Sequence, residues 1–496
     1  MKVFDWIASH ADRQPDKLAQ IDWHTQRRYS YREMHERVAG LAGYLRHETG
    51  VSKGDRVALL SLNGSDVFDL QFACARIGAI FCPLNNRLAV PELEYIVNEL
   101  KPKVLFSDAA FEGTARTIGT SLTTMRLVEL DSEIGASDVE PVFNMVEQED
   151  VDTWIILYTS GTTGTPKGVR IHHGMVIANI LASVGPTRLS RDSVNLCFLP
   201  HFHTGGLNIF ANPCFYLGGT NITLQKFDAD LLLRILTDKT LKVTHFIGVP
   251  STFQMLANET GFESTDFGHI VSPFIGGAPA PPALLQQYAD VGLNLIHGFG
   301  MTEAGPIAIT LDAETALSKS GSCGKPPINL EVKLIKRDGL EATGQEIGEI
   351  WLKGEAVTRG HWRNEAATNE AFEDGWLRTG DAAYKDDEGF YYIADRWKNM
   401  YISGGENVYP AEVEKVIYGM EAVFEVAVVG EPHEKWGETG AAYIALHEGS
   451  RLSEDDVVGY CQERLAKYKV PSRVIFLKEL PHNATGKILK HELSNA

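Results

Sequence analysis

Strand-like and helix-like segments alternate over roughly the first 400 residues, and this alternation is the feature that most limits how the chain can fold. Short apolar runs predict strands at residues 57–62, 79–84 and 104–106. Helical patterns predict helices at residues 67–77 and 91–100, the second with a proline in its first turn. Strands and helices joined by short connections indicate a largely parallel sheet covered by helices. The predicted fold class is therefore α/β, with a large N-terminal domain of mixed, largely parallel sheets.

The last part of the chain, after about residue 400, follows a different pattern. Ser453 begins a helix and has an acid, Asp456, in the capping-box position. Another helix is predicted at residues 411–418, and strands at 425–429, 441–446 and 473–477. Together these elements predict a small α+β domain of roughly 95 residues. The charged stretch 395–399 lies between the two patterns and predicts a domain boundary there.

The composition is that of an ordinary globular protein, with 44% hydrophobic and 22% charged residues among 496. The net charge of −19 argues against nucleic-acid binding, which needs a basic surface. Residues 460–496 are the exception, with seven Lys and Arg against three Glu, and such a cationic end suits a small phosphorylated ligand. The six cysteines are scattered, so neither a disulfide framework nor a zinc site is expected.

The expected compartment is the cytoplasm. No apolar run approaches the ~18–20 residues that span a bilayer, so no transmembrane segment is expected. The first residues carry acids where a signal peptide needs a basic start and an apolar stretch, and the last residues match no lipidation or retrieval signal.

A glycine-rich loop, TSGTTGTPKG at residues 159–168, directly follows the buried strand predicted at 154–159. Glycines let a backbone turn sharply and approach a ligand closely, and hydroxyl groups with free N–H groups can surround phosphate oxygens. Lys167 adds a mobile cation. The loop contains neither a Walker motif nor a GxGxxG dinucleotide motif. It therefore predicts a phosphate-binding loop of another kind.

This loop resembles the signature loop of the acyl-adenylate-forming superfamily, which contains acyl-CoA synthetases, adenylation domains and luciferases. Further family-like motifs follow in the family's order: PHFHTGG at 200–206, GGAPAP at 276–281, GFGMTEAGP at 298–306, GEIWLKG at 348–354, RTGD at 378–381, DRWKNMYISGGENVYPAEVE at 395–414 and PHNATGKILK at 481–490. The resemblance covers essentially the whole chain. It implies a reaction in which ATP and a carboxylic acid give acyl-AMP and pyrophosphate, after which the thiol of coenzyme A displaces AMP.

The resemblance also implies roles for particular residues. Lys487 would bridge the substrate carboxylate and the α-phosphate, Glu303 would hold Mg²⁺, and Thr302 would contact the α-phosphate. A carboxylate is a weak nucleophile and must approach an anionic phosphate, so the site has to supply positive charge and to orient the two groups. ATP would be held by the loop residues Thr159, Ser160, Gly161, Thr162, Thr163, Gly164 and Lys167, by Gly277, Ala278, Pro279, Phe299 and Gly300 around adenine, and by Asp381 and Arg396 at the ribose.

The two domains would rotate between the half-reactions about a hinge at Lys398, where the acid that commonly follows in the family is Asn399 here. The expected division is an N-terminal domain at 1–395, a hinge at 396–400 and a small mobile C-terminal domain at 401–496. Gly405 and Glu406 would belong to the loop that lines the tunnel for the pantetheine of coenzyme A.

The acid substrate is the least constrained feature. His203 resembles the family's histidine in the acyl pocket, where it orients or gates. Motif proximity suggests a pocket of apolar or small residues: Phe202, His203, Gly206, Phe246, Val249, Phe274, Gly276, Gly300 and Ile307. A bulky apolar acid is expected, and acetate or a dicarboxylate is disfavoured. The motifs resemble both feruloyl- or coumarate-CoA ligases and compact fatty-acyl-CoA synthetases, so aromatic and fatty acids both stay open.

An acyl-CoA synthetase is favoured over a carrier-loading adenylation enzyme, because the pocket motif lacks the acid that would bind an α-amino group. A luciferase-like activity has no positive feature. The expected partner is a small carboxylic acid, and a homodimer is left open.

Overall fold

The structure is a computed structural model that describes residues 2–119, 126–129, 139–159, 166–278, 280–397, 399–403, 406–433, 436–482 and 488–493. Contacts divide the chain into two compact units. The first comprises Met1–Ser320, Gly324–Glu331 and Leu352–Leu377, and the second comprises Gly321–Cys323, Val332–Trp351 and Arg378–Ala496. The hinge expected at residues 396–400 stays a prediction.

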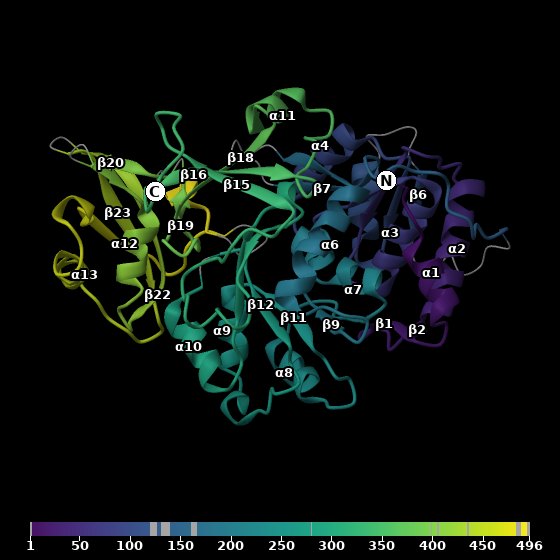
Figure 1. Ribbon diagram of the computed structural model, residues 1–496, viewed down its shortest axis with the longest axis horizontal. Coiled ribbons are helices and arrows are strands. Elements are labelled where there is room, and N and C mark those ends of the chain that lie inside the picture. Colours follow the sequence, from purple (N-terminus) through teal and green to yellow (C-terminus); the bar gives the residue numbers. More distant parts are fainter. Residues whose placement is uncertain are drawn as a thin grey trace. The chain divides into compact units, whose positions relative to one another are not determined.

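A six-stranded sheet in the first unit contains the strands predicted from the alternating pattern (Figure 1). Its order is β6 (Arg126–Glu129), β5 (Val104–Ser107), β3 (Arg56–Leu60), β4 (Ile80–Pro83), β7 (Thr153–Thr159) and β8 (Lys167–His172). All neighbours are parallel except β7 and β8, which form an antiparallel hairpin around the glycine-rich loop. The helices α3 (Ser65–Ile77) and α4 (Val90–Leu100) begin within two residues of their predicted starts.

The second sheet of this unit has eight strands. Its order is β14 (Ile307–Thr310), β13 (Ile296–Gly300), β12 (Ser272–Ile275), β11 (His245–Gly248), β9 (Val194–Cys197), β10 (Thr220–Thr223), β1 (Leu18–Asp22) and β2 (Arg28–Ser30). The inner pairs are parallel, and the pairs at the two edges are antiparallel. The α/β class with mixed, largely parallel sheets is confirmed.

Apolar side chains on these sheets pack against helices. The largest core joins the six-stranded sheet to α1 (Trp6–Arg13), α2 (Tyr31–His47), α3, α6 (His173–Thr187) and α7 (Ala211–Leu217). The eight-stranded sheet packs against α8 (Ala229–Thr237), α9 (Pro250–Ala257) and α10 (Pro282–Asp290), which are teal in Figure 1. Two further helices of the unit are α5 (Glu112–Gly119) and α11 (Glu365–Ala371).

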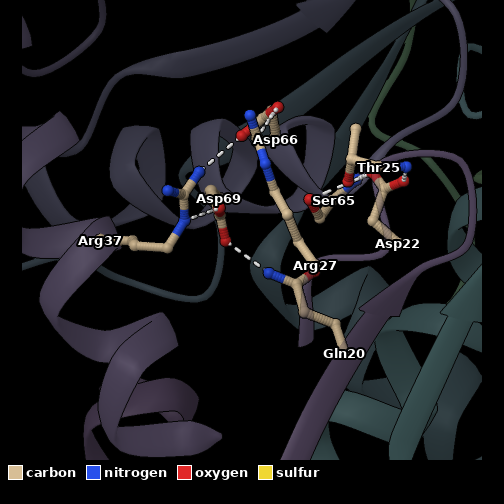
Figure 2. Close-up of polar contacts among 8 residues, drawn as sticks. All are labelled: Gln20, Asp22, Thr25, Arg27, Arg37, Ser65, Asp66 and Asp69. Atoms are coloured by element: carbon tan, nitrogen blue, oxygen red, sulfur yellow. Dashed lines mark hydrogen bonds and ion pairs between the residues drawn. The ribbon is translucent and has the colours of Figure 1, made fainter. Parts of the chain in front are cut away.

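A buried polar network ties α2 and α3 to β1 (Figure 2). The carboxylate of Asp69 is fully buried and accepts hydrogen bonds from Arg37 Nε at 2.7 Å and from Gln20 Nε2 at 2.7 Å. Asp22 accepts from the backbone N–H of Ser65, the first residue of α3, at 2.9 Å. Burial raises the pKa of Asp69, and the charge of Arg37 opposes that shift. The network thereby holds a helix of the six-stranded core against a strand of the other sheet.

The second unit contains a small sheet whose strands are β20 (Tyr401–Ser403), β21 (Glu406–Val408), β22 (Val423–His433), β23 (Gly437–Leu446) and β24 (Arg473–Phe476). Helices α12 (Pro410–Ile417) and α13 (Glu454–Gln462) pack on it, and α14 (Lys490–Leu493) follows. The capping box predicted at Ser453 and Asp456 is present. The predicted α+β character is confirmed, although β22 runs four residues beyond its predicted end.

A further five-stranded sheet is formed by β15 (Leu330–Ile335), β16 (Gly348–Gly354), β17 (Phe372–Glu373), β18 (Trp376–Lys385) and β19 (Tyr391–Arg396). Within the described part of the chain, every helix is too short or too polar to cross a membrane.

Candidate active site

The turn after β13 brings together the residues expected around adenine and the α-phosphate. Gly300 makes this turn feasible, because a Cβ there would lie 1.8 Å from the carbonyl oxygen of Pro306. Thr302 lies in the short 3₁₀ turn Thr302–Ala304 that follows and is buried, whereas Phe299 is only half-buried. A half-buried aromatic at a strand end can offer one ring face to a planar base.

The neighbouring strand end supplies the other predicted adenine contacts. Because β12 and β13 are parallel and adjacent, their carboxyl ends meet at one edge of the sheet, as in other α/β ligand sites. Gly277 and Ala278 are exposed there, and Gly277 has the left-handed φ of +80° that favours glycine. Pro279 lies outside the described residues.

Thr302 and Glu303 offer the oxygen ligands that Mg²⁺ prefers. The Glu303 side chain is 15% exposed, so its carboxylate can reach a ligand. Its backbone carbonyl accepts a hydrogen bond of 2.8 Å from Thr358 N–H. The described residues contain no group of three or more His, Cys, Asp or Glu that could hold a metal alone. Mg²⁺ bound with ATP keeps several of its ligands as phosphates and water, so a single protein carboxylate such as Glu303 fits that ion.

The hairpin of β7 and β8 holds the two ends of the glycine-rich loop side by side, since Thr159 and Lys167 are paired across it. Residues 160–165 lie outside the described part, so the predicted contacts of Ser160, Gly161, Thr162, Thr163 and Gly164 are not placed. The ammonium nitrogen of Lys167 lies 3.6 Å from a carboxylate oxygen of the largely exposed Glu370. Such an exposed pair is weak, so Lys167 can exchange this partner for a phosphate.

Residues 358–362, which contain none of the family-like motifs, connect the Glu303 turn to β8. Thr358 donates to Glu303, as described above, and Trp362 N–H donates to the carbonyl of Gly168 at 2.7 Å. His361, in the same segment, has its Nε2 atom 3.7 Å from Glu303 Oε1. A histidine three residues after Thr358 carries no motif of its own, so only the structure places it near the Glu303 carboxylate.

The predicted ribose pair, Asp381 and Arg396, is in direct contact. The two residues are cross-strand partners on β18 and β19, and Arg396 Nε lies 3.0 Å from Asp381 Oδ1. Arg396 also donates to the carbonyl oxygen of Thr379 at 3.3 Å. The guanidinium therefore orients a carboxylate whose side chain is only 8% exposed.

Other predicted residues of this unit are placed less completely. Glu406 is exposed at the start of β21, while Gly405, Lys398 and Lys487 lie outside the described residues. Asn399, next to the predicted hinge, donates from its side chain to Asp395 Oδ1 at 3.2 Å. This contact shows how an amide is accommodated where an acid is usual.

On the acyl side, His203 is exposed to solvent yet surrounded closely enough by protein that desolvation lowers its pKa, and the charge of Arg87 lowers it further. The imidazole is therefore neutral at pH 7. The π-helix Gly205–Ile209 begins two residues after His203, and Gly206 is needed there because a Cβ would lie 2.3 Å from the carbonyl oxygen of Pro200. Short π-helical turns are frequent at functional sites.

The predicted pocket residues lie on two faces of the sheet. Phe274 packs edge-to-face with Phe210 in a cluster that includes Ile247. Phe246 instead stacks on Phe253 in the core beneath α9 and α10. Neighbouring residues of a strand point to opposite faces, so Phe246 is separated from Phe274 by the sheet. Motif proximity does not reveal the face of a strand, so the predicted pocket contains residues of both faces, and which of them line it stays a prediction.

Family models and individual relatives both place this chain among the same group of enzymes. Residues 7–362 match AMP-binding enzymes, and residues 412–487 match the AMP-binding enzyme C-terminal domain. A feruloyl-CoA synthase from Amycolatopsis sp is 38% identical over 465 residues, which cover 94% of this chain and 93% of that protein. A 2-succinylbenzoate–CoA ligase from Bacillus cereus strain Q1 is 35% identical over 490 residues, covering 99% of this chain and 98% of that one.

A solved structure agrees over the whole chain. The o-succinylbenzoate CoA synthetase from Bacillus subtilis, in complex with its acyl-adenylate intermediate, has a TM-score of 0.90 at 32% identity and covers 100% of this chain and 99% of its own. That enzyme has also been solved with ATP and a magnesium ion. The resemblance predicted from the motifs is thus confirmed: the chain belongs to the AMP-binding enzymes and is an AMP-forming acid–thiol ligase of the acyl-CoA synthetase class.

Proposed function

We propose that this ligase activates a bulky aromatic carboxylic acid of the arylpropenoic kind, such as ferulate or coumarate, and transfers it to coenzyme A. The observation that carries the choice is the 38% identity to a feruloyl-CoA synthase over nearly the whole chain. Medium- or long-chain fatty acids and a carrier protein as acyl acceptor are the alternatives.

In the first half-reaction, a carboxylate oxygen of the acid forms a bond to the α-phosphorus of ATP, and pyrophosphate leaves. Mg²⁺ supplies charge neutralisation at the phosphates. Thr302 and Glu303 would hold ATP and its cation at the carboxyl end of β13, and Phe299 with Gly277 and Ala278 would bind adenine. Asp381, oriented by Arg396, would accept hydrogen bonds from the ribose hydroxyls. Lys487 would bridge the two anionic groups, where an electrostatic contact lowers the barrier most.

In the second half-reaction, the thiol sulfur of coenzyme A forms a bond to the acyl carbon, AMP leaves, and the thiol proton passes to solvent. Glu406 and Gly405 would line the path of the pantetheine. His203 would orient the acyl group as a neutral imidazole, since desolvation and the charge of Arg87 both lower its pKa.

The function is tested with one panel of acids, comprising ferulate, coumarate, cinnamate, decanoate and palmitate, with Mg²⁺-ATP and coenzyme A. Pyrophosphate, AMP and thioester are quantified. We expect kcat/KM for the arylpropenoic acids to exceed that for fatty acids on the order of 10²-fold, as shape-matched pockets achieve. A preference for fatty acids overturns the choice of acid, and ADP as product overturns adenylation. Acyl transfer to a phosphopantetheinyl protein but not to coenzyme A would establish the carrier-loading alternative.

Lys487→Ala is expected to lower acyl-AMP formation on the order of 10²–10³-fold or more and to spare thioester formation from supplied acyl-AMP. The reason is that the lysine serves charge build-up at the α-phosphate only. Single-turnover measurement of each half-reaction checks this. Equal loss in both half-reactions means that the role of Lys487 is misassigned.

A further inference from the structure

A buried histidine lies beside the carboxylate that is expected to hold the cation. His361 Nε2 is 3.7 Å from Glu303 Oε1, just beyond hydrogen-bond distance, and the His361 side chain is 5% exposed. Its other ring nitrogen, Nδ1, is buried without a hydrogen-bond partner. Buried polar groups normally have partners, so an imidazole in this position calls for an explanation.

The backbone holds His361 rigidly in this place. Its N–H donates to Thr368 Oγ1 at 2.9 Å, and its backbone forms an antiparallel bridge with Val169 of β8. On one side of it Gly360 accepts from Arg170 N–H at 3.2 Å, and on the other Trp362 donates to Gly168. The backbone of His361 is therefore held in place, and a change in the separation of the two side chains would come from rotation of the Glu303 side chain.

A second carboxylate, Glu99, also interacts electrostatically with His361. Burial raises the pKa of Glu99, and Arg363 and His361 both oppose that rise. Glu99 is therefore the competing partner that an experiment has to separate from Glu303.

We propose that His361 is a positioning residue for Glu303: its Nε2–H binds one carboxylate oxygen and so directs the other oxygen toward the cation bound with ATP. This inference rests on the proposed role of Glu303. Partners that orient a ligating carboxylate typically change metal affinity 10–100-fold when they are removed. The separation of 3.7 Å exceeds a normal N–H···O distance by roughly 0.5–1 Å, so a small rotation of the Glu303 side chain would form the hydrogen bond.

The test measures metal binding without turnover. Mn²⁺ is titrated by electron paramagnetic resonance into protein saturated with an ATP analogue whose α,β-bridging oxygen is a methylene group. His361→Phe keeps a ring but removes both nitrogens, and we expect it to raise the Kd of Mn²⁺ about 10-fold or more. His361→Gln, whose amide reaches the position of Nε2, should restore most of the affinity. His361→Asn reaches only the position of Nδ1 and should bind as weakly as His361→Phe.

Three comparisons make the result decisive. His173→Phe replaces another buried histidine, stacked on Trp154, and should leave the Mn²⁺ affinity unchanged. Glu303→Gln combined with His361→Phe should bind no more weakly than Glu303→Gln alone, since both changes act through one carboxylate. Glu99→Gln should leave the Mn²⁺ affinity unchanged.

The outcomes separate the inference from the function on which it rests. If Glu303→Gln binds Mn²⁺ normally, the proposed role of Glu303 fails and the inference fails with it. If Glu303→Gln binds weakly while folded His361→Phe or His361→Asn binds normally, only the inference is overturned. A loss in Glu99→Gln equal to that in His361→Phe would show that His361 acts through Glu99. Should His361→Phe not fold, the contrast between the Asn and Gln variants decides the matter alone.

Discussion

At the turn after β13, where the chain reverses direction, the space for side chains is smallest. A Cβ added at Gly300 would lie 1.8 Å from the carbonyl oxygen of Pro306, and backbone atoms have little room to move away. The half-buried ring of Phe299 and the buried Thr302 lie on either side of this glycine. A side chain at position 300 would therefore disturb the adenine and phosphate contacts together.

Gly300→Ala is expected to abolish most pyrophosphate release and to lower the thermal unfolding midpoint, because overpacking against backbone costs about 1–3 kcal/mol. Gly40→Ala is the matched control. Gly40 lies in α2 with no atom within 4 Å of an added Cβ, so alanine there should be neutral or stabilise the helix by up to about 1 kcal/mol. Normal activity of Gly300→Ala would contradict the turn as described.

Three buried histidines make the stability of the protein depend on pH. Burial lowers the pKa of His173 to about 4, of His201 to about 3 and of His245 to about 4. An unfolded histidine titrates near 6.5. Below about pH 6.5 the unfolded chain therefore binds protons that the folded chain does not, and each histidine costs up to about 1.4 kcal/mol per pH unit. The stability gained by burying these histidines in the neutral form is complete above pH 6.5 and is lost as the pH falls toward 4.

We expect the unfolding midpoint to fall between pH 7 and pH 5, and to fall less in His245→Gln, which keeps a donor for the carbonyl of Thr187. Scanning calorimetry at several pH values gives the slope of the unfolding midpoint against pH for the unchanged protein and for His245→Gln, and the two slopes are compared. Parallel curves for the two proteins would show that His245 is not buried in the neutral form.

At the scale of elements, short strands and the helices between them could be predicted because apolar runs and helical periodicity are local properties. The strands at 57–62, 79–84 and 104–106 and the C-terminal elements are confirmed within a few residues, except that β22 ends four residues after its predicted end and β23 begins four residues before its predicted start. The face of a sheet on which a residue lies is not a local property, and so the predicted pocket grouped Phe246 with Phe274 although the two lie on opposite faces. His361 was missed because its contact with Glu303 joins residues far apart in the chain. No pattern within a single segment records such a contact.

Asn179 shows how one side chain joins three elements. Its amide nitrogen in α6 donates to the carbonyl of Asn208 in the π-helix at 2.7 Å, and its oxygen accepts from the N–H of Ile307 in β14 at 3.0 Å. All three residues are buried. The acyl side of the site is thereby connected to the strand that follows the Glu303 turn.

Asn179→Leu should lower the unfolding free energy by about 2–5 kcal/mol, because two buried backbone groups lose their partners. It should also raise the KM for the acid, since the π-helix is no longer held. Ser183→Ala is the control on the same helix. The Ser183 hydroxyl donates to the carbonyl of Ile180 within α6 at 2.9 Å, so its removal should cost less than about 1 kcal/mol. If both substitutions change KM equally, Asn179 does not act by connecting the π-helix to β14.

For the whole molecule, the two half-reactions need different groups at one site, and the resemblance predicts rotation about Lys398. Proline at that position would hold φ near ~−65° and restrict Trp397 as well. We expect Lys398→Pro to retain pyrophosphate release and lose turnover with coenzyme A, whereas Lys398→Ala should be much milder. Rapid-quench measurement of both half-reactions checks this. Turnover of Lys398→Pro with coenzyme A at the normal rate would move the pivot elsewhere.

The division of the chain into two units has a consequence for exchanging parts between related genes. The path passes from one unit to the other after Ser320, Cys323, Glu331, Trp351 and Leu377, so the second unit is assembled from three separate stretches. Within it, Asp395 accepts from the N–H of Ala411 at 2.7 Å, and Tyr409 and Met400 pack with Ala382. A hybrid gene joined at a single point near residue 400 would take these facing residues from different parents. Recombination that respects the contacts has to transfer residues 321–323, 332–351 and 378–496 as one inherited set.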